Sequence, residues 1–328
     1  MSKKIDLGIS LYGFTERFIK EDDYGFEEMF KDLSTLGIKK FEIVGAQMFD
    51  QYPNPRDEEI QEVVELAKKY DVKPYSYGAY IDYGKRSDRD LTDAEQLNEV
   101  ALELMTAYKL GCKFMRCDIP LSIAGEIAEM AEKYQIVVCK EIHAPERPSD
   151  PHIQELANKF EEIGSDWIGF VPDFGCFIER PNQLHIDRFL GLGAKVENLQ
   201  FIIDNRWNDY TEESMTAKIE EMGGGEAEKM AISEWFGYLS FAPADIEGFK
   251  SILPYSKYFH GKYYHIGEDC IETTIPYETL IRLISESGFE GTLIIEYEGH
   301  SFYRNDALEQ LERHIEMENN IFNKLGLS

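Results

Sequence analysis

Residues 113–145 read KFMRCDIPLSIAGEIAEMAEKYQIVVCKEIHAP and hold two strand-like segments on either side of an amphipathic segment. Lys113–Pro120 and Ile136–Pro145 are short runs rich in apolar residues, a pattern that is typical of buried strands. Ala124–Gln135 repeats its apolar residues with the period of a helix. Because a helix of this length can carry the chain back across a sheet, the two strands can pair in parallel. The stretch predicts one strand–helix–strand unit.

The same alternation of strand and helix continues in both directions along the chain. Six further strand candidates are Ile5–Gly13, Lys40–Gln47, Val72–Tyr80, Trp167–Gly175, Tyr258–Ile266 and Gly291–Gly299. Eight alternating units in 328 residues favour an α/β fold, a (β/α)₈ TIM barrel that forms a single domain over residues 1–328. A doubly wound open sheet is the alternative, but no strand candidate is followed by GxGxxG or GxxxxGK[ST].

The regular spacing breaks once, between Gly175 and Tyr258. We expect a long helical insertion at about 177–255, between the sixth and seventh strands. Barrel active sites lie at the carboxyl ends of the strands, so an enlarged connection there is a candidate lid or docking surface. The extra helices could equally only cover the barrel wall.

The composition argues against several classes of partner and site. With 62 acidic and 34 basic residues the net charge is −28, and so acidic a surface repels phosphate backbones and anionic lipids; we expect no nucleic acid and no membrane as partner. We see no secretory signal and no apolar run long enough to span a bilayer, which favours a cytoplasmic protein. The five cysteines form no CxxC pair, so free buried thiols are favoured over disulfides or a thiolate zinc site.

Ionisable residues stand at the ends of the last four predicted strands, in KEIHAP, VPDFG, FHGKYYH and IIEYEGH. Side chains alternate along a strand, so residues two positions apart share a face. The pairs that share a face are Glu141 with His143, His260 with Lys262, and Glu296 with Glu298. Pairs that face the barrel interior would converge at its mouth.

Four of these residues form a candidate metal site if they all point inward: Glu141, Asp173, His260 and Glu296. Three carboxylates and one imidazole suit Mn²⁺, Mg²⁺ or a similar divalent ion that leaves positions open for water or substrate. Without a cation the carboxylates would repel one another, so a metal is the natural counter-charge. Any one of them alone is more often a solvated, capping or ion-paired residue, but four in phase on consecutive strands favour the metal site.

These motifs resemble those of the xylose-isomerase-like TIM barrels, which include sugar isomerases, ketose epimerases and enzymes of inositol catabolism. The resemblance covers nearly the whole chain, and the four candidate ligands occur in the order that this superfamily uses for its divalent metal. Within it, the E-x-H of Glu141 and His143, the H-G-K that holds His260 and Lys262, and the EYEG ending are most similar to the alpha subunits of the C-glycoside deglycosidases.

The resemblance implies a carbon–carbon lyase with a bound divalent metal, Mn²⁺ before Mg²⁺ or Co²⁺. Its substrate would be a 3-oxo-C-glucoside, in which a carbon–carbon bond joins a 3-oxo-glucosyl group to an aromatic, flavonoid-like aglycone. The resemblance also implies a hetero-oligomer with a small β-rich beta subunit as permanent partner. The helical insertion offers aromatic candidates for that contact, which could also be buried within the insertion itself: Trp207, Trp235, Phe236, Tyr238 and Phe241.

The chemistry of such a substrate matches the residues. A ketone at sugar C3 acidifies the hydrogen on C2, so that a base can remove it while a metal stabilises the developing negative charge and the C1 substituent leaves. His143 is the base we expect, since an imidazole titrates near neutral pH. Lys262 could neutralise a developing oxygen anion or form a structural ion pair. Glu298 and His265 are weaker candidates for supporting roles.

Three other functions have to be weighed against this interpretation. A ketose epimerase or sugar isomerase could use the same metal, but those epimerases usually carry E-x-x-N-R and D-x-x-H, whereas here Ala144 and Pro145 follow His143 and Cys176 takes the place of the second histidine. A metal-free binding barrel is the second alternative. A DNA-repair endonuclease of related fold would need more than seven histidines and a basic face.

Aromatic residues cluster at the ends of the first and third predicted strands: Tyr12, Phe14, Tyr75, Tyr77 and Tyr80. They could stack on an aglycone or a sugar, or pack into the barrel rim.

Overall fold

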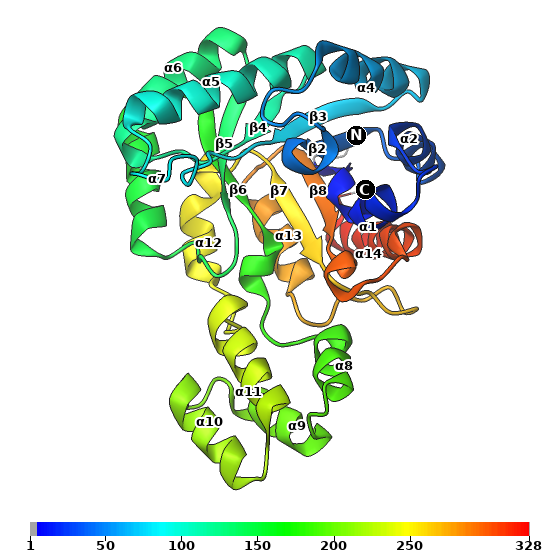
Figure 1. Ribbon diagram of the computed structural model, residues 1–328, viewed down its shortest axis with the longest axis vertical. Coiled ribbons are helices and arrows are strands. Elements are labelled where there is room, and N and C mark those ends of the chain that lie inside the picture. Colours follow the sequence, from blue (N-terminus) through cyan, green and yellow to red (C-terminus); the bar gives the residue numbers. More distant parts are fainter. Residues whose placement is uncertain (1–4, 328) are drawn as a thin grey trace.

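The protein is described by a computed structural model that covers residues 5–327 (Figure 1). Within that range eight parallel strands form one sheet in the order β6-β5-β4-β3-β2-β1-β8-β7. The strands are β1 Ile5–Ser10, β2 Lys40–Val44, β3 Lys73–Gly78, β4 Phe114–Arg116, β5 Val137–Ile142, β6 Ile168–Pro172, β7 Phe259–Tyr263 and β8 Gly291–Tyr297. Two isolated bridges, Phe170 to Ser256 and Asp173 to His260, join β6 to the β7 side and close the ring. The predicted (β/α)₈ barrel is confirmed.

Every predicted strand is present, but each ends before the predicted last residue. Asp173 was expected within a strand, yet it follows β6 and begins a short 3₁₀ turn, Phe174–Phe177, where its carboxylate accepts a hydrogen bond from the Gly175 amide. Glu298 likewise lies just beyond β8. The chain leaves the sheet at Asp173, whose side chain caps the turn locally, whereas the Glu298 side chain contacts Tyr12 and Lys262.

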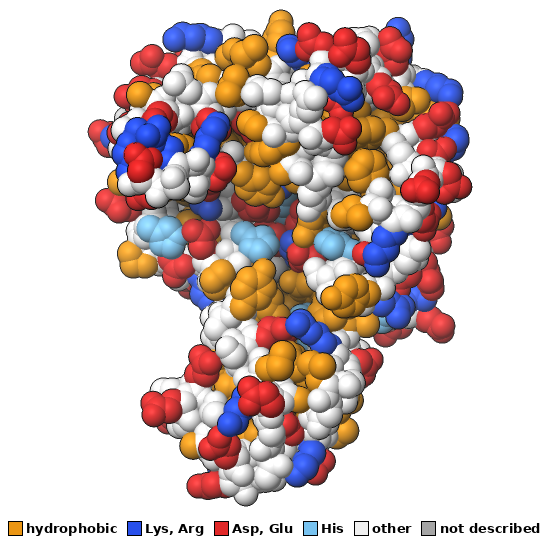
Figure 2. All heavy atoms as spheres, in the orientation of Figure 1, with side chains coloured by type: hydrophobic (Ala, Val, Ile, Leu, Met, Phe, Trp, Pro, Cys, Tyr) orange, Lys and Arg blue, Asp and Glu red, His pale blue; other side chains and the backbone are white. Residues whose placement is uncertain are grey.

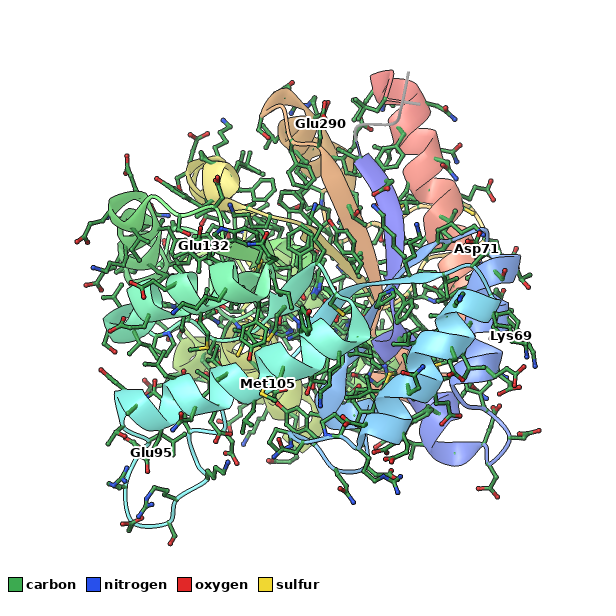
Figure 3. The ribbon with its side chains drawn as sticks, turned by 90° about the horizontal axis from the view of Figure 1, so that it is seen from above. Lys69, Asp71, Glu95, Met105, Glu132 and Glu290 are labelled. Atoms are coloured by element: carbon green, nitrogen blue, oxygen red, sulfur yellow. The ribbon has the colours of Figure 1, made fainter. Side chains whose placement is uncertain are left out.

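Helices surround the barrel with their apolar faces inward and their charged faces outward (Figure 3). They are α1 Thr15–Lys20, α2 Phe26–Thr35, α3 Gly45–Met48, α4 Asp57–Lys69, α5 Asp93–Leu110, α6 Ala124–Tyr134, α7 Pro151–Ile163, α13 Tyr277–Glu286 and α14 Ala307–Leu325. The longest of those on the N-terminal half, α5, begins with a capping box between Thr92 and Glu95 and ends at Gly111, whose φ of 79° closes the helix in the left-handed conformation.

The connection from β6 to β7 carries a lobe that projects from the end of the barrel where the strands terminate (Figure 1). Its helices are α8 Gln183–Gly191, α9 Val196–Asn205, α10 Glu212–Glu221 and α11 Glu226–Ser233, followed by a π-helical turn at Glu234–Tyr238 and by α12 Ile246–Ile252, which returns to the barrel. Whether barrel and lobe form one domain remains a prediction.

The lobe has a small aromatic core of its own. Trp235 is 1% exposed and packs edge-on against Phe189, with ring centroids 5.6 Å apart, while Phe241 is fully buried. The expectation that these two residues could serve a partner interface is therefore wrong, because the lobe itself buries them. Trp207 and Tyr238 are 52% and 68% exposed, so they remain candidates for a partner interface.

The lobe contacts the loops that follow β5, β7 and β8. The His185 ring of α8 lies 4.9 Å from the rings of both Tyr264 and Phe302. Arg147, which follows β5, donates hydrogen bonds to the carbonyls of Ser240 and Pro243. Figure 2 shows histidine, acidic and hydrophobic side chains gathered at this junction. The lobe thus stands beside the mouth of the barrel, where the predicted site residues lie.

All five cysteines are free and four of them are buried, as expected; Cys270 is partly exposed. Across residues 5–327, none of the helices combines the length and the apolar character needed to cross a bilayer.

Candidate metal centre

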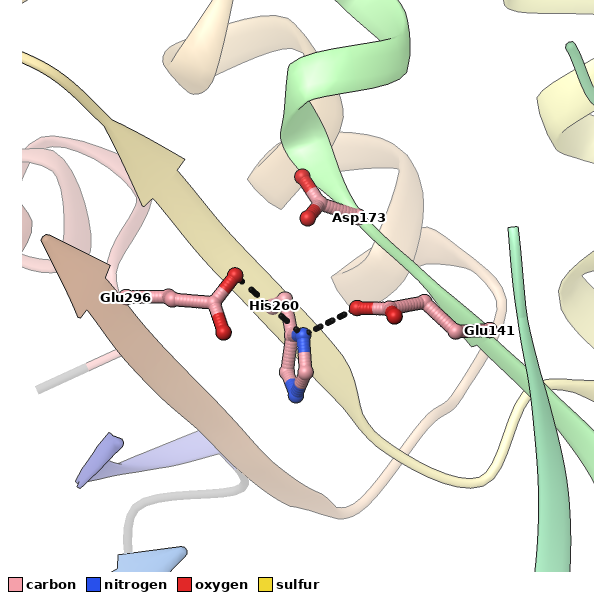
Figure 4. Close-up of side chains that lie close together, drawn as sticks. All are labelled: Glu141, Asp173, His260 and Glu296. Carbon is pink, nitrogen blue, oxygen red and sulfur yellow. Dashed lines mark hydrogen bonds and ion pairs between the residues drawn. The ribbon is translucent and has the colours of Figure 1, made fainter. Parts of the chain in front are cut away.

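Four side chains from neighbouring strands meet inside the mouth of the barrel (Figure 4). Glu141 comes from β5, His260 from β7 and Glu296 from β8, and Asp173 follows β6. Each offers one ligand atom, and these four atoms all lie within 4.8 Å of one another. The structure therefore meets the condition that these four candidate ligands all point inward, and they form a possible divalent-metal site.

His260 lies between two sets of carboxylates. Its Nδ1 atom is 2.7 Å from Glu141 Oε1 and 3.6 Å from Glu296 Oε2. On the opposite edge of the ring, Nε2 is 3.2 Å from Glu42 Oε2. Glu42 belongs to β2 and is completely buried. The edge of the ring that carries Nδ1 is the one that faces the other candidate ligands.

The donor set fits a cation. Asp173 is fully buried, and within residues 5–327 its Oδ2 atom has no hydrogen-bond partner, although Lys262 Nζ lies 3.5 Å away. Burial raises the pKa of Asp173 to about 6, against the opposing effect of Lys262, and the negative charges of Glu296 and Glu141 add to the rise. A buried oxygen with an unfilled acceptor position beside two more carboxylates is what a divalent ion would satisfy.

Arg116 of β4 is the first of two buried cations that hold the carboxylates in place. Its Nη1 atom is 2.8 Å from Glu141 Oε2 and 3.2 Å from the Tyr80 hydroxyl. Its Nε atom is 3.8 Å from Glu42 Oε1. Burial would raise the pKa of Glu42, but His260 and Arg116 bring it down to about 2. Arg116 thus keeps the β2 and β5 carboxylates ionised.

Lys262 of β7 is the second buried cation. Its Nζ atom is 2.8 Å from Glu296 Oε2 and 3.0 Å from Glu298 Oε2. Burial opposes its charge, yet Glu296, Glu298 and Asp173 hold the pKa of Lys262 well above its ordinary value. Of the two roles expected for this residue, the structure shows the ion pairs; a protonated lysine cannot serve as a base.

His143 follows β5 and is the most accessible of the predicted site residues, with 40% of its side chain exposed. Its Nε2 atom lies 4.0 Å from Asp173 Oδ2. Its Nδ1 atom lies 2.6 Å from the carbonyl oxygen of Ala144. Because a carbonyl can only accept, Nδ1 carries the proton and donates, which leaves the lone pair of Nε2 directed toward the site.

The remaining predicted residues divide into those near the centre and those away from it. Glu298 accepts a hydrogen bond of 3.2 Å from the Tyr12 hydroxyl, and the Tyr12 ring packs edge-on against His300 at 4.5 Å. His265 instead lies beside α14, with its Nδ1 atom 3.3 Å from Gln310 Nε2. The structure does not bring His265 to the centre.

Only two of the five clustered aromatic residues reach the mouth. Tyr12 and Tyr80 lie beside Glu298 and Arg116, respectively, and Tyr80 is 44% exposed. The other three are buried and pack into the core, as the packing alternative expected: Phe14, Tyr75 and Tyr77.

Two charged residues of the site escaped the sequence analysis, Glu42 and Arg116. Each is a charged residue with apolar neighbours on both sides in a predicted strand, in FEIVG of residues 41–45 and FMRC of residues 114–117. That signal was present, because a charge in a buried strand requires a partner. The last four predicted strands show a different pattern, since they carry their charges at their ends.

Comparisons with known proteins agree with this architecture. The family described as "Xylose isomerase-like TIM barrel" matches residues 30–318. A C-glycoside deglycosidase alpha subunit of Microbacterium trichothecenolyticum is 27% identical over 89% of this chain and 83% of its own. Another protein of that name, from Arthrobacter globiformis, is 29% identical over 91% and 86%. A 3'-dehydrocarminate deglycosidase alpha subunit of a Microbacterium species is 26% identical over 92% and 90%.

Solved structures show the same fold at much lower identity. A D-psicose 3-epimerase of Clostridium cellulolyticum, solved with D-tagatose, superposes with a TM-score of 0.55 at 12% identity and covers 98% of this chain and 99% of its own. The IOLI protein, solved with a zinc atom, superposes with a TM-score of 0.56 at 12% identity over 98% and 99%. Together with the family match over most of the chain, the barrel and its four convergent side chains show that this protein belongs to the xylose isomerase-like TIM barrel family.

Proposed function

We propose that the chain is the alpha subunit of a metal-dependent C-glycoside deglycosidase. It would cleave the carbon–carbon bond between a 3-oxo-glucosyl group and an aromatic aglycone. The relatives with this name support the proposal over most of their length. The observation that carries it is the position of His143, whose Nε2 lone pair faces a cluster of three carboxylates and one imidazole.

The metal would be held by Glu141, Asp173, His260 and Glu296, and we propose Mn²⁺ before Mg²⁺ or Co²⁺. When bound, such an ion supplies positive charge that stabilises an oxygen anion as it develops on the substrate. Although burial opposes it, Arg116 holds the pKa of Glu141 well below its ordinary value, and Lys262 Nζ lies 2.8 Å from Glu296 Oε2; both cations thus orient carboxylates that would bind the metal.

His143 would act as the base. Its Nε2 atom takes the proton from C2 of the 3-oxo sugar, and the electron pair of that C–H bond forms a C1–C2 double bond as the bond from C1 to the aglycone breaks. The electrons of the broken bond leave with the aglycone carbon, which takes up a proton. The step needs neither oxidant nor reductant. The Ala144 carbonyl helps by holding the proton on Nδ1, so that Nε2 is the atom that accepts.

Lys262 and Glu298 would support this step without exchanging protons with the substrate. Lys262 remains protonated and places a fixed positive charge beside Glu296. Glu298, which also accepts from Tyr12, lies 3.0 Å from the same Lys262 Nζ and helps to fix it. Both are positioning residues in this scheme.

The epimerase alternative is less well supported by the geometry. In that reaction two glutamates on opposite sides of the substrate exchange protons with carbon. Here Glu141 is 2.8 Å from Arg116, and Glu296 is 2.8 Å from Lys262. Although burial opposes it, Arg116 holds the pKa of Glu141 well below its ordinary value, which opposes the use of this carboxylate as an acid, and the Glu296 carboxylate is engaged by Lys262.

The partner would be a small β-rich beta subunit, and the complex would reside in the cytoplasm. The relatives are called alpha subunits, which implies a partner subunit for them. Trp207 and Tyr238 of the lobe are the exposed aromatic residues that would contact it. An acidic chain gains little from a charge match with a second acidic protein, so an apolar contact is expected.

The test is to incubate the chain, alone and with a co-expressed small partner, with a 3-oxo-C-glucoside and a ketohexose in parallel. We expect the free aglycone from the first substrate and no epimer from the second. A ketohexose epimer without aglycone release would overturn the proposal in favour of the epimerase. If the isolated chain cleaves the 3-oxo-C-glucoside at the full rate, only the proposal of a partner subunit is overturned.

A further inference from the structure

Glu42 is a charged side chain buried at the centre of the barrel, below the candidate metal centre. It is 0% exposed, although an ionised carboxylate is costly to remove from water. Five groups surround it: Ser10 Oγ at 3.3 Å, Ser76 Oγ at 2.7 Å, the Tyr258 hydroxyl at 3.0 Å, His260 Nε2 at 3.2 Å and Arg116 Nε at 3.8 Å.

The sheet register holds Glu42 in place. Ser10 of β1 and Ser76 of β3 are the residues that pair with Glu42 on its two neighbouring strands. Their hydroxyls therefore reach the carboxylate from both sides at the same level of the barrel. Because a carboxylate can only accept, each of these hydroxyls donates. The position of Glu42 is set by the rigid sheet, and no loop movement is needed to form it.

The contact with His260 determines which ring nitrogen can serve as a ligand. Glu42 accepts from Nε2, so the proton there is fixed on the edge of the ring that faces away from the centre. Nδ1 lies on the opposite edge, 2.7 Å from Glu141 Oε1 and 3.6 Å from Glu296 Oε2, where a bound cation would take the place of the proton that Nδ1 otherwise donates to Glu141. A metal-bound histidine needs this arrangement, in which one nitrogen donates to a carboxylate and the other coordinates.

We infer that Glu42 is a positioning residue, which fixes the orientation and the tautomer of His260 so that Nδ1 coordinates the metal. The inference rests on the metal-binding part of the proposed function. Glu42 cannot be a ligand of the same ion, because the imidazole ring lies between its carboxylate and the other ligands. A neutral residue of similar size would fill the space at lower cost, so packing alone does not explain the charge.

The first test compares Glu42→Gln with the matched control Glu103→Gln. Glu103 of α5 is also a buried glutamate, 1% exposed, and it accepts a 2.9 Å hydrogen bond from the Tyr77 hydroxyl, but it faces none of the candidate ligands. Mn²⁺ affinity is measured by titrating the chelator-treated full chain. We expect Glu42→Gln to weaken Mn²⁺ binding about 10- to 100-fold. Glu103→Gln should leave the Mn²⁺ affinity within about twofold of the native value, because Glu103 faces none of the candidate ligands; a twofold change is the lower end of what one hydrogen bond contributes.

A second readout is the visible absorption spectrum of the Co²⁺-loaded chain, which responds to ligand geometry and not to stability. It should change in Glu42→Gln and stay as in the native chain in Glu103→Gln. If Glu42→Gln does not fold, Tyr258→Phe replaces it, because this change removes only a hydroxyl that holds Glu42. It should weaken Mn²⁺ binding about three- to tenfold, the value of one hydrogen bond.

The inference would be overturned if Glu42→Gln shows native Mn²⁺ affinity together with a native Co²⁺ spectrum. If Glu42→Gln does not fold, the same result in Tyr258→Phe would overturn it. A native chain that binds no divalent ion would overturn it together with the metal site. A native chain that binds Mn²⁺ but releases no aglycone from a 3-oxo-C-glucoside would overturn the proposed function only, since the effect of Glu42 on metal affinity is measured without substrate.

Discussion

Two buried contacts between a histidine and a glutamate lie in different regions of the protein. His260 and Glu42 face the inside of the barrel. His314 and Glu318 lie one turn apart on α14, outside the barrel, with Nε2 3.1 Å from Oε1. All four side chains are 0% exposed. The residue types, the burial and the length of the contact are nearly the same, so the difference between the two contacts lies in their surroundings.

The α14 pair has aromatic neighbours. The His314 ring lies 4.3 Å from the ring of Tyr263 and 5.2 Å from that of Tyr277. In the part of the chain that the structure describes, His314 Nδ1 and Glu318 Oε2 have no hydrogen-bond partner. Burial lowers the pKa of His314 to about 3 and raises that of Glu318 well above its ordinary value. The pair is therefore neutral.

The barrel pair has cations and hydroxyl donors around it, and these keep Glu42 and Glu141 ionised despite their burial. The comparison teaches that a buried histidine–glutamate contact does not by itself indicate a functional site. The cluster inside the barrel can receive a metal because Arg116 keeps Glu141 ionised, while Asp173 Oδ2 has no hydrogen-bond partner among the described residues. The pair on α14 offers a metal nothing but two neutral groups.

The largest effect we expect from the barrel cluster is that of His143→Ala. Turnover of the 3-oxo-C-glucoside should fall about 10²- to 10⁴-fold, the usual contribution of a positioned base. Metal content should stay nearly native, because His143 is not among the four residues whose ligand atoms converge. Steady-state kinetics and elemental analysis check the two parts. Loss of the metal would make His143 a ligand, and unchanged turnover would make another residue the base.

The α14 pair should be replaceable, in contrast to the barrel pair. In the double variant His314→Leu, Glu318→Leu, two buried polar atoms without partners are removed. We expect the free energy of unfolding to stay the same or to rise by about 1 to 4 kcal/mol, as for other buried polar pairs that were replaced by apolar residues. Denaturant unfolding measures it. A loss of stability, or a loss of Mn²⁺ binding, would show that the pair does more than pack.

A smaller effect concerns the pH dependence of stability. The ordinary pKa values of Glu318 and His314 are 4.5 and 6.5. Between these pH values the unfolded pair carries its one titratable proton on His314, and the folded pair carries it on Glu318. The pair then adds no pH dependence. Above pH 6.5 the unfolded chain loses its proton while the folded chain keeps it, so this contribution to stability falls as the pH rises, by up to about 1.4 kcal/mol per pH unit.

Glu318→Gln isolates this contribution, because it removes the carboxyl group whose pKa is raised and keeps an uncharged side chain in contact with His314. A group with a raised pKa stabilises the folded chain at low pH and loses that effect as the pH rises. The unfolding free energy of the variant minus that of the native chain should therefore rise from pH 5 to pH 8, by up to about 1.4 kcal/mol per pH unit. Denaturant unfolding across this range measures the difference. A flat difference would mean that Glu318 is ionised in the folded chain.

Much of the barrel could be predicted from the sequence, because strand and helix periods are local properties. The positions of Glu141, His260 and Glu296 near the ends of their strands also predicted that these residues converge if they point inward, and the structure brings them together. Residues that meet across the barrel could not be found in this way. Glu42 and His260 are 218 positions apart, and only closure of the ring makes them neighbours.

For the lobe, the sequence left two alternatives open, a partner interface and burial within the insertion. Trp235 and Phe241 carry no local signal that separates an interface from a core, and the helices of the lobe fold over them. The strands were predicted to extend beyond their actual last residues, because the polar residues that follow a strand also fit its alternation of inward and outward side chains. Asp173 illustrates this, since it fits the strand pattern but caps a turn.

Anomalous diffraction from a crystal of the chain grown with Mn²⁺ tests the central claim most directly. Data collected at the manganese absorption edge should show one strong peak per chain, within coordination distance of Glu141, Asp173, His260 Nδ1 and Glu296, with Glu42 on the far side of the imidazole ring. A crystal with no peak between these four side chains, or with a peak bound through His260 Nε2, would contradict the account.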